Sequence, residues 1–402
     1  MRYVIIGASA AGCRAAETLR RCDAGGSITL ISEEPRPLYS RPMLTYLLSG
    51  EVALDQVWLQ GEDYFSRLGL EAVLGEPVIR VDPRAREVRL ASGRSLSYDR
   101  LLLASGARPR TPGIPGEDLA GVFTLRTLAD WQRLQAGLPE GGPVAVVGAG
   151  AVGLKAAEAL GHRGHPVILL EGEDRALPRR LDETAAALLH AALARRGVEL
   201  HLNARPGAVL GQGGRVRALA LADGREIPCA AVLLATGVAP NIEFLAGTGL
   251  TDENGLTVDS KLQTPDPDIF AAGDCTRAPH FLTGEPAYYP IWPVAAAQGR
   301  VAGANLAGGE FTYDGVLPQN SISLGGFHLI SGGLTPGEAG EESAIVTDLD
   351  RRRDQYRRLV YRQGRLVGLT FVGAFEDAGI YFQLMAQQLP NQERVNPGQM
   401  WG

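Results

Sequence analysis

The chain contains the same kind of short segment twice: an apolar run of strand length, a turn of small residues and a helix-compatible stretch. The first copy is Y-V-I-I-G-A-S-A-A-G at residues 3–12, and the second is P-V-A-V-V-G-A-G-A-V-G at residues 143–153. Such a unit binds a pyrophosphate, because the turn presents free backbone N–H groups and the positive end of the helix dipole to the phosphate oxygens. The repeat therefore predicts two dinucleotide-binding segments.

The glycine pattern differs between the two copies. In the first, Gly7 and Gly12 are present, but Ser9 replaces the glycine that usually stands in the middle of the turn. In the second, the pattern G-x-G-x-x-G is complete, at Gly148, Gly150 and Gly153. A single imperfect pattern is weak evidence, whereas two copies with the same downstream features are not expected by chance.

An acidic residue follows each copy. Glu33 comes after the apolar run 27–32, and Glu171 comes after the run 166–170. At about this distance from the turn, a carboxylate can accept hydrogen bonds from a ribose 2′-OH. A carboxylate at Glu171 would repel a 2′-phosphate and favours NADH over NADPH, although Arg175 could accept such a phosphate.

A second repeated feature lies further along the chain. The sequence L-L-A-S-G ends at Gly106, and L-L-A-T-G ends at Gly237. In both halves the order is glycine turn, acid and small-residue turn, which indicates an internal duplication. The stretch T-P-G-I-P-G at residues 111–116 is dense in proline and glycine and predicts a crossing between domains.

The bulk properties exclude several classes of function. A chain of 402 residues is too long for one ordinary core and predicts two or three domains. Its net charge of −6 argues against general nucleic-acid binding, and no apolar run is long enough to span a bilayer. The four cysteines form neither a C-x-x-C pair nor a metal-ligand spacing. We therefore expect a cytoplasmic protein in a reducing compartment, without a metal site.

Four further segments resemble those of the two-dinucleotide-binding-domain flavoproteins. This class of pyridine nucleotide oxidoreductases includes rubredoxin and ferredoxin reductases, NADH oxidases and the flavin module of NADH nitrite reductases. The segments are P-L-Y-S-R-P-M-L-T-Y-L-L-S-G at 37–50, S-Y-D-R-L-L-L-A-S-G-A-R-P at 97–109, I-F-A-A-G-D-C at 269–275 and Y-P-I-W-P-V-A-A-A-Q-G-R-V-A-G-A-N-L-A at 289–307. Together with the two glycine turns, they extend the resemblance over essentially the whole chain.

The resemblance implies an α/β fold with two doubly wound, Rossmann-like domains and a small C-terminal α/β domain. An FAD-binding domain would comprise residues 1–112 and 242–314, and an NAD(P)H-binding domain residues 113–241. Residues 315–402 would form an interface domain, which makes the homodimer in most members of the class. The segment 269–275 contains the pair Gly273-Asp274, which we call the Gly-Asp signature and which resembles the second flavin signature of the class. This signature and the order in the chain assign the first glycine turn to FAD and the second to the nicotinamide nucleotide.

The resemblance also implies contacts to the two cofactors, FAD and NADH, with NADPH as an alternative to NADH. For FAD the candidates are Gly7, Ser9, Ala10, Ala11, Gly12, Glu33, Arg41, Pro42, Val78, Ala104, Ser105, Gly106, Gly273, Asp274, Pro293 and Val294. For the nicotinamide nucleotide, or for the region near both cofactors, they are Arg126, Gly148, Gly150, Ala151, Val152, Gly153, Glu171 and Gly237. Two residues are candidates for a role in the reaction itself, Lys155 and Arg41.

The implied activity is a transfer of electrons from NADH through the flavin to an acceptor. Members that reduce disulfides carry a redox cysteine at or near residues 37–50, but this sequence has no cysteine between Cys22 and Cys229. That absence argues against a disulfide reductase and favours a rubredoxin, a ferredoxin or a partner iron–sulfur subunit as acceptor. Two alternatives remain open, an NADH oxidase that reduces dioxygen and an NADH-sensing flavoprotein like apoptosis-inducing factor.

One position departs from the pattern of the class. Members usually have glutamate two residues after the last glycine of the second turn, close to the flavin and the nicotinamide, whereas this chain has Lys155 in G-L-K-A-A. We hypothesise that Lys155 helps to hold the reduced flavin; a lysine that merely extends off its helix is the alternative. A second basic feature, the arginines within residues 351–358, is either a solvated hairpin or a docking patch for an acidic carrier.

Overall fold

The computed structural model describes residues 1–36, 38–252 and 255–387, and it divides into two compact units. Unit 1 combines Met1–Met43, Ala53–Arg108 and Val238–Val316. Unit 2 combines Leu44–Val52, Pro109–Gly237 and the chain from Leu317 onward. Neither unit is continuous in sequence, so each is described separately.

Unit 1 is built on a parallel sheet with the strand order β19-β7-β1-β2-β3. Two of its strands are the apolar runs that the sequence predicts, the one before the first glycine turn and the one at residues 27–32, and Tyr3, Val4, Ile5 and Ile6 are all buried. The sheet strands are β1 (Arg2–Ile6), β2 (Ser27–Ser32), β3 (Leu70–Leu74), β7 (Arg100–Leu103) and β19 (Ile269–Ala271).

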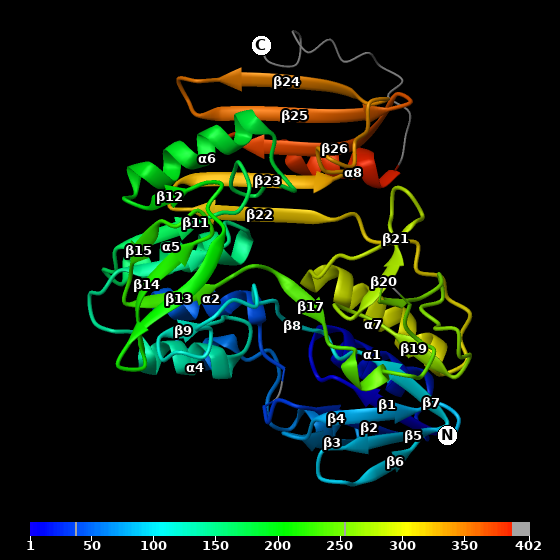
Figure 1. Cartoon of the computed structure of the whole chain (residues 1–402). Coiled ribbons are helices and arrows are strands. Elements are labelled where there is room, and N and C mark those ends of the chain that lie inside the picture. The colour runs from blue at the N-terminus through cyan, green and yellow to red at the C-terminus, as the bar shows by residue number, and fades with distance from the viewer. Residues whose placement is uncertain (37, 253–254, 388–402) are drawn as a thin grey trace. The chain divides into compact units, whose positions relative to one another are not determined.

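Two helices of unit 1, α1 (Ala10–Cys22) and α7 (Trp292–Leu306), pack closely against each other (Figure 1). A Cβ atom on Gly299 would lie 2.2 Å from the carbonyl oxygen of Ala11, and one on Gly303 would lie 2.4 Å from that of Ala15. These contacts require glycine on α7, because a side chain would force the two helices apart.

The rest of unit 1 consists of short elements around this core. A three-stranded antiparallel sheet contains β4 (Val78–Asp82), β5 (Glu87–Leu90) and β6 (Ser95–Ser97). The other elements are η1 (Arg41–Met43), η2 (Leu54–Val57), α3 (Tyr64–Arg67), β8 (Ala107–Pro109), β17 (Val238–Pro240), η3 (Glu243–Leu245), β18 (Leu256–Thr257), β20 (Thr276–Pro279) and β21 (Pro286–Ala287).

Unit 2 contains a second parallel sheet, with the order β12-β11-β10-β16-β9. Its strands are β9 (Val122–Phe123), β10 (Val144–Val147), β11 (Val167–Leu170), β12 (Glu199–His201) and β16 (Ala231–Leu234). Its helices are α2 (Leu44–Ser49), α4 (Leu128–Gly137), α5 (Ala151–His162) and α6 (Glu183–Arg195). A small antiparallel sheet adds β13 (Pro206–Gln212), β14 (Arg215–Leu221) and β15 (Glu226–Pro228).

The C-terminal part of unit 2 is a five-stranded antiparallel sheet with the order β22-β23-β26-β25-β24 (Figure 1). Its elements are β22 (Gln319–Leu324), β23 (Phe327–Gly333), β24 (Ala344–Asp350), β25 (Gln355–Arg362), β26 (Arg365–Val372) and α8 (Ala378–Gln387).

The two parallel sheets confirm the expected α/β fold with a duplicated strand–turn–helix unit. Within the described ranges, no helix is both long and apolar enough to cross a bilayer. The basic stretch near the C-terminus separates into two groups. Arg351, Arg352 and Arg353 are exposed in the turn between β24 and β25, whereas Arg357 and Arg358 are largely buried.

Candidate dinucleotide-binding sites

Both glycine turns bring backbone atoms into close contact. Gly7 has a φ of +114°, and a Cβ atom on Gly12 would lie 1.8 Å from the carbonyl oxygen of Gly7. In the second turn, Gly148 has a φ of +104°, and a Cβ on Gly153 would lie 1.9 Å from its carbonyl oxygen. The first and last glycines of both patterns are therefore needed for the fold of the turn itself.

The middle position of each turn has no such requirement. Ser9 is the N-cap of α1 with φ −101°, and Gly150 is the N-cap of α5 with φ −75°. Both values are accessible to any residue, and a Cβ atom on Gly150 would meet no other atom within 4 Å. The protein backbone therefore explains why serine is accepted in the first turn.

The N-termini of α1 and α5 fit a phosphate group. Neither helix has an acidic residue in its first turn, and neither N-cap residue makes a side-chain capping hydrogen bond to the N–H groups of its helix. The N–H groups of the first turn are thus without a side-chain cap, and the helix dipole favours a negative charge there. The predicted residues of these turns differ in exposure: Ala10 and Ala11 are buried, whereas Ala151 and Val152 are exposed.

Glu171 is fixed beside the second glycine turn. Its Oε2 accepts a hydrogen bond from the backbone N–H of Ala149 at 2.9 Å, and its Oε1 accepts one from that of Glu173 at 3.2 Å. The turn itself is attached to β11, because the N–H of Gly148 donates to the carbonyl of Leu170 at 2.7 Å. The carboxylate therefore lies at the edge of the turn.

The equivalent position in unit 1 is Ser32. The N–H of Gly7 donates to the carbonyl of Ile31 at 2.7 Å, so the next residue, Ser32, corresponds to Glu171. The hydroxyl of Ser32 accepts a hydrogen bond from the N–H of Glu34 at 3.1 Å, as Glu171 does from Glu173. The predicted acid Glu33 is one residue further on and is exposed.

Glu34 is a residue that the sequence analysis missed. It accepts hydrogen bonds from the hydroxyl of Tyr39 at 2.6 Å and from the guanidinium of Arg41. Arg41 also donates to Ser9 Oγ, at 3.4 Å, and so joins this cluster to the glycine turn. The two adjacent acids in S-E-E gave no sequence signal that would have selected the second.

Arg41 is held as a charged group. Burial by itself lowers the pKa of its guanidinium, but the attraction of Glu34, with a contribution from Asp274, outweighs burial and raises that pKa. The segment that carries Arg41 in the sequence and the Gly-Asp signature are therefore close enough in unit 1 to interact electrostatically. Pro42 follows in η1, and Val78 is half-buried at the start of β4.

The small-residue turns lie against the glycine turns in both units. A Cβ atom on Gly7 would be 2.0 Å from the carbonyl oxygen of Ala104, and one on Gly148 would be 2.5 Å from that of Ala235. Ser105, between Ala104 and Gly106, donates from its hydroxyl to the carbonyl of Asn241 at 2.6 Å. In unit 2, the corresponding Gly237 accepts from the N–H of Arg110 at 2.9 Å.

The Gly-Asp signature lies at the N-terminal part of α1. A Cβ atom on Gly273 would come within 2.9 Å of the Cβ of Ala11. The backbone N–H of Gly273 donates to Gln298 Oε1 at 2.7 Å. Gln298 is buried on α7 and is a second residue that the sequence analysis missed, since an isolated glutamine on a helix carries no motif. Pro293 and Val294 stand in the first turn of α7, a position that proline favours.

Lys155 is enclosed within unit 2. Its ammonium group donates to Glu158 and, at 3.0 Å, to the carbonyl of Ser323 on β22, and it lies 4.8 Å from the ring centre of Tyr46 on α2. The alternative of a lysine that extends freely into solvent does not describe this environment, because the side chain is 18 % exposed. Arg126 lies just before α4, where its backbone N–H donates to Asp130 at 2.9 Å.

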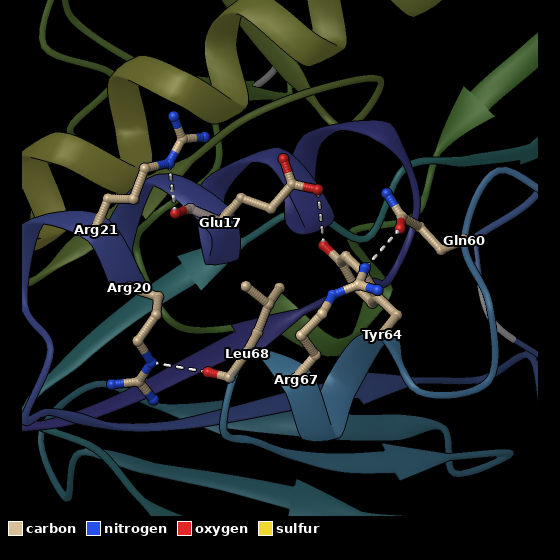
Figure 2. Close-up of a pocket in the computed structure, with 7 residues that line it drawn as sticks. All are labelled: Glu17, Arg20, Arg21, Gln60, Tyr64, Arg67 and Leu68. Carbon is tan, nitrogen blue, oxygen red and sulfur yellow. Dashed lines mark hydrogen bonds between the residues drawn. The ribbon is translucent and has the colours of Figure 1, made fainter.

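Figure 2 shows a pocket of unit 1 that lies beside α1. It is lined by Glu17, Arg20, Arg21, Gln60, Tyr64, Arg67 and Leu68, none of which is a predicted cofactor contact. Arg20 has a structural role there, because its guanidinium donates to five backbone carbonyls, including that of Leu68 at 2.8 Å. The pocket therefore does not define the candidate site.

The four cysteines are all free thiols. Cys13, Cys229 and Cys275 are buried, and burial raises the pKa of Cys13 to about 12 and those of Cys229 and Cys275 to about 11. These three thiols are therefore protonated and inaccessible near neutral pH, while Cys22 is exposed at the end of α1.

Comparisons with known proteins agree with this duplicated geometry. Residues 1–299 match the family model for pyridine nucleotide-disulphide oxidoreductase. The chain is 33 % identical to the epsilon subunit of the NADH-dependent phenylglyoxylate dehydrogenase of Aromatoleum evansii, over 96 % of this chain and 92 % of the relative. It is 32 % identical to an NADH oxidase of Methanocaldococcus jannaschii, over 98 % and 94 % of the two chains.

The fold is likewise similar to solved structures. The ferredoxin reductase for the CYP199A2 system of Rhodopseudomonas palustris has a TM-score of 0.86 and 30 % identity, over 94 % of this chain and 92 % of that one. Since the family model covers well over half of the sequence and the relatives match nearly all of it, the chain belongs to the pyridine nucleotide-disulphide oxidoreductase family and is an oxidoreductase that uses FAD and NAD(P)H.

Proposed function

We propose that the protein transfers electrons from NADH through FAD to a one-electron carrier, either a rubredoxin- or ferredoxin-type protein or a partner iron–sulfur subunit. The observation that carries this proposal is the pair of glycine turns with equivalent geometry in separate units. In this assignment the first turn binds FAD and the second binds NADH. FAD supplies a hydride acceptor that can release electrons singly, which links a nicotinamide to a one-electron carrier.

The residues of the chain bind and orient the cofactors in this proposal. The first turns of α1 and α5 donate N–H groups to the two pyrophosphates, and Glu171 accepts hydrogen bonds from the ribose of NADH. Arg41, Ser9 and Asp274 hold FAD in unit 1, together with the other predicted FAD contacts. The positive end of α7, which begins at Trp292, stabilises negative charge on the bound flavin.

The cysteines argue against a disulfide as the acceptor. Disulfide reduction requires an accessible thiolate beside the cofactor, whereas three of the four cysteines are buried with a raised pKa. The segment with Arg41 contains no cysteine. Electrons therefore leave for an external acceptor. The names of two relatives support a carrier protein or a partner subunit as acceptor, since one is a ferredoxin reductase and one is the epsilon subunit of an NADH-dependent dehydrogenase.

The preference for NADH over NADPH is supported by the charges around Glu171. Arg175 could otherwise accept a 2′-phosphate, but its Nε lies 3.4 Å from Asp174 Oδ1 and its Nη1 lies 3.8 Å from Glu183 Oε1. These acids compete with a phosphate for the guanidinium. Because Glu171 also lies beside the turn, the local negative charge is unfavourable for the 2′-phosphate of NADPH.

Lys155 is proposed to influence the reduced flavin electrostatically, with Glu158 as its fixed counter-ion. The test is Lys155→Glu in the FAD-loaded protein. We expect a slower reduction by NADH and a more negative midpoint potential, because a positive charge has been replaced by a negative one. Unchanged kinetics and an unchanged potential would remove Lys155 from the mechanism.

The assembly is also a proposal. We infer that residues 1–112 with 242–314 bind FAD, that residues 113–241 bind NADH, and that residues 315–402 form a homodimer interface. Exposed apolar side chains in the last part, at Phe375, Ile380 and Leu384, support an interface there. We further propose a cytoplasmic location, which the free thiols support. Light scattering of the purified protein tests the dimer.

One anaerobic experiment tests the main proposal. The FAD-loaded protein is mixed with NADH or NADPH, loss of the visible flavin absorbance is followed, and a [2Fe–2S] ferredoxin, a rubredoxin or dioxygen is then added. We expect fast bleaching with NADH, slower bleaching with NADPH, and faster reoxidation by the iron–sulfur carriers than by dioxygen. Failure to bind FAD would overturn the proposal as a whole.

The same experiment distinguishes the second candidate, an NADH oxidase. The similarity to an NADH oxidase over 98 % of this chain favours that candidate. Rapid oxygen consumption with NADH alone, at a rate that added carriers do not raise, would support it. Bound FAD that NADH does not bleach would instead indicate a nucleotide-sensing flavoprotein.

A further inference from the structure

Helix α6 lies beside the C-terminal sheet (Figure 1), and its N-cap residue is Asp182. Oδ1 of Asp182 accepts the capping hydrogen bond from the N–H of Ala185 at 2.9 Å. Oδ2 accepts a hydrogen bond from the hydroxyl of Tyr356 at 2.6 Å and lies 3.3 Å from Nε of Arg358. Tyr356 and Arg358 both belong to β25, so one carboxylate joins the helix to the sheet.

The contact between Asp182 and β25 involves a buried charge. The side chain of Arg358 is 5 % exposed, and that of Asp182 is 24 % exposed. A buried guanidinium without its carboxylate would be strongly unfavourable, which is why this pair resists separation more than a solvated surface pair. Tyr356 is also buried, and burial, followed by its hydrogen bond to Asp182, raises its pKa and keeps the hydroxyl a donor.

The residues between Glu171 and Asp182 connect this contact to the second glycine turn. The N–H of Leu177 donates to the carbonyl of Ala149, within the turn, at 3.1 Å. The N–H of Ala176 donates to Nε2 of His190 on α6, at 3.1 Å. Leu177 is buried and has a φ of +52°, a conformation that only a constrained segment retains. The segment 172–181 thus lies between the glycine turn and α6.

We propose that Asp182, Tyr356 and Arg358 are positioning residues for pyridine nucleotide binding. They fix the N-terminus of α6, and α6 fixes segment 172–181 against the glycine turn and beside Glu171. This inference rests on the proposed function, in which the second turn and Glu171 bind NADH. The C-terminal sheet, which carries no predicted nucleotide contact, thereby contributes to the affinity for the nucleotide.

The test uses the FAD-loaded protein and the variant Tyr356→Phe, which removes one hydrogen bond and keeps the ring. Dissociation constants for NAD⁺ and ADP-ribose are measured by calorimetry, and KM and kcat for NADH with ferricyanide as acceptor. We expect both dissociation constants and KM to rise on the order of 5-fold. The variant loses one hydrogen bond to a carboxylate, and only part of that loss is transmitted to segment 172–181. The value of kcat and the FAD content should not change.

Arg195→Gln is the matched control. It breaks the ion pair of Arg195 with Asp354, at 3.0 Å, which joins the other end of α6 to the same sheet. We expect its nucleotide affinity to equal that of the wild type. An equal loss in both variants would indicate general loosening of unit 2 and would overturn the proposal.

Asp182→Asn is the second variant, because asparagine retains the helix cap and loses the charge. It should weaken ADP-ribose binding more than Tyr356→Phe does, because it also leaves the buried Arg358 guanidinium without its carboxylate. The double variant should lose less than the two single effects combined. Wild-type affinity in Tyr356→Phe and Asp182→Asn would contradict the positioning role. By contrast, a wild-type protein that binds no ADP-ribose would show that the proposed function itself is wrong.

Discussion

The carboxylate of Glu171 accepts a hydrogen bond from the backbone N–H of Ala149, at 2.9 Å, and so stands at the edge of the second glycine turn. This contact holds one oxygen of the carboxylate in place, while the ribose of the proposed NADH would use the same group as an acceptor. A hydrogen bond to a charged acceptor contributes about 1.5–3 kcal/mol to binding.

We therefore expect Glu171→Gln to raise KM for NADH by roughly 10- to 100-fold and to reduce the preference over NADPH. Steady-state kinetics with both nucleotides measure the effect. Glu173→Gln serves as the control, because Glu173 is a neighbouring acid whose side chain faces Arg205 at 3.4 Å. If the two variants behave alike, Glu171 has no special contact with the ribose.

Two glycines on α5 provide a matched pair. A Cβ on Gly153 would lie 1.9 Å from the carbonyl oxygen of Gly148, whereas one on Gly161 would meet no atom within 4 Å. We expect Gly153→Ala to lower the free energy of unfolding by about 1–3 kcal/mol, as overpacking does. Gly161→Ala should raise it by about 0.5–1 kcal/mol, since alanine favours the helix. Urea denaturation measures the free energy of unfolding of both variants. Equal changes in Gly153→Ala and Gly161→Ala would mean that the glycine turn is not closely packed.

The pair of Lys155 and Glu158 is largely enclosed, with side chains 18 % and 9 % exposed. Lys155→Met would leave the Glu158 carboxylate without its cation, and we expect a loss of about 3 kcal/mol in the free energy of unfolding. The double variant Lys155→Met/Glu158→Gln should regain most of that loss. Denaturant unfolding of the three proteins tests this, and a double variant as unstable as the single one would contradict the account.

His190 introduces a dependence of stability on pH. Its Nε2 accepts the N–H of Ala176, so the ring is neutral in the folded protein, and burial lowers the pKa of His190 below its ordinary value of 6.5. The unfolded chain therefore binds the proton first as pH falls. The stabilisation of the folded protein by neutral His190 is therefore complete above about pH 6.5. It is lost as the pH falls from there through the lower pKa that His190 has in the folded protein.

The measurement compares unfolding of wild type and His190→Gln at about pH 7.5 and about pH 5.5. The stability difference between the two proteins should be larger at the higher pH. Asp174, Arg175 and Glu183 line the same pocket as His190 and are unchanged in both proteins, so the comparison isolates His190. A difference that does not change with pH would exclude His190 as the responsible group.

The sequence predicted the parts of this fold that depend on local chemistry. Apolar runs identified β1 and β10, and the glycines at positions 7, 12, 148 and 153 are required by close backbone contacts that any such turn makes. The duplicated order of turn, acid and small-residue turn also survives as equivalent contacts of Ala104 and Ala235 with the glycine turns. These signals repeat because the backbone geometry repeats.

The side-chain partners could not be predicted in the same way. Glu33 and Glu34 are adjacent and chemically equal, and only the hydrogen bond seen in the folded chain shows that Glu34 is the one bound by Arg41. The environment of Lys155 depends on Ser323, which is distant in sequence. Gln298 and Asp182 belong to no motif. Each of these contacts is made by residues that meet only in the folded chain.

The discontinuous course of unit 1 has a consequence for synthesis on the ribosome. Strand β19 is the edge partner of β7, yet the whole parallel sheet of unit 2 is encoded between them. At ~5–20 residues per second, the two strands emerge on the order of ten seconds or more apart. Until then β7 keeps one edge without its native partner, so the nascent chain should be most susceptible to proteolysis and chaperone binding during that interval.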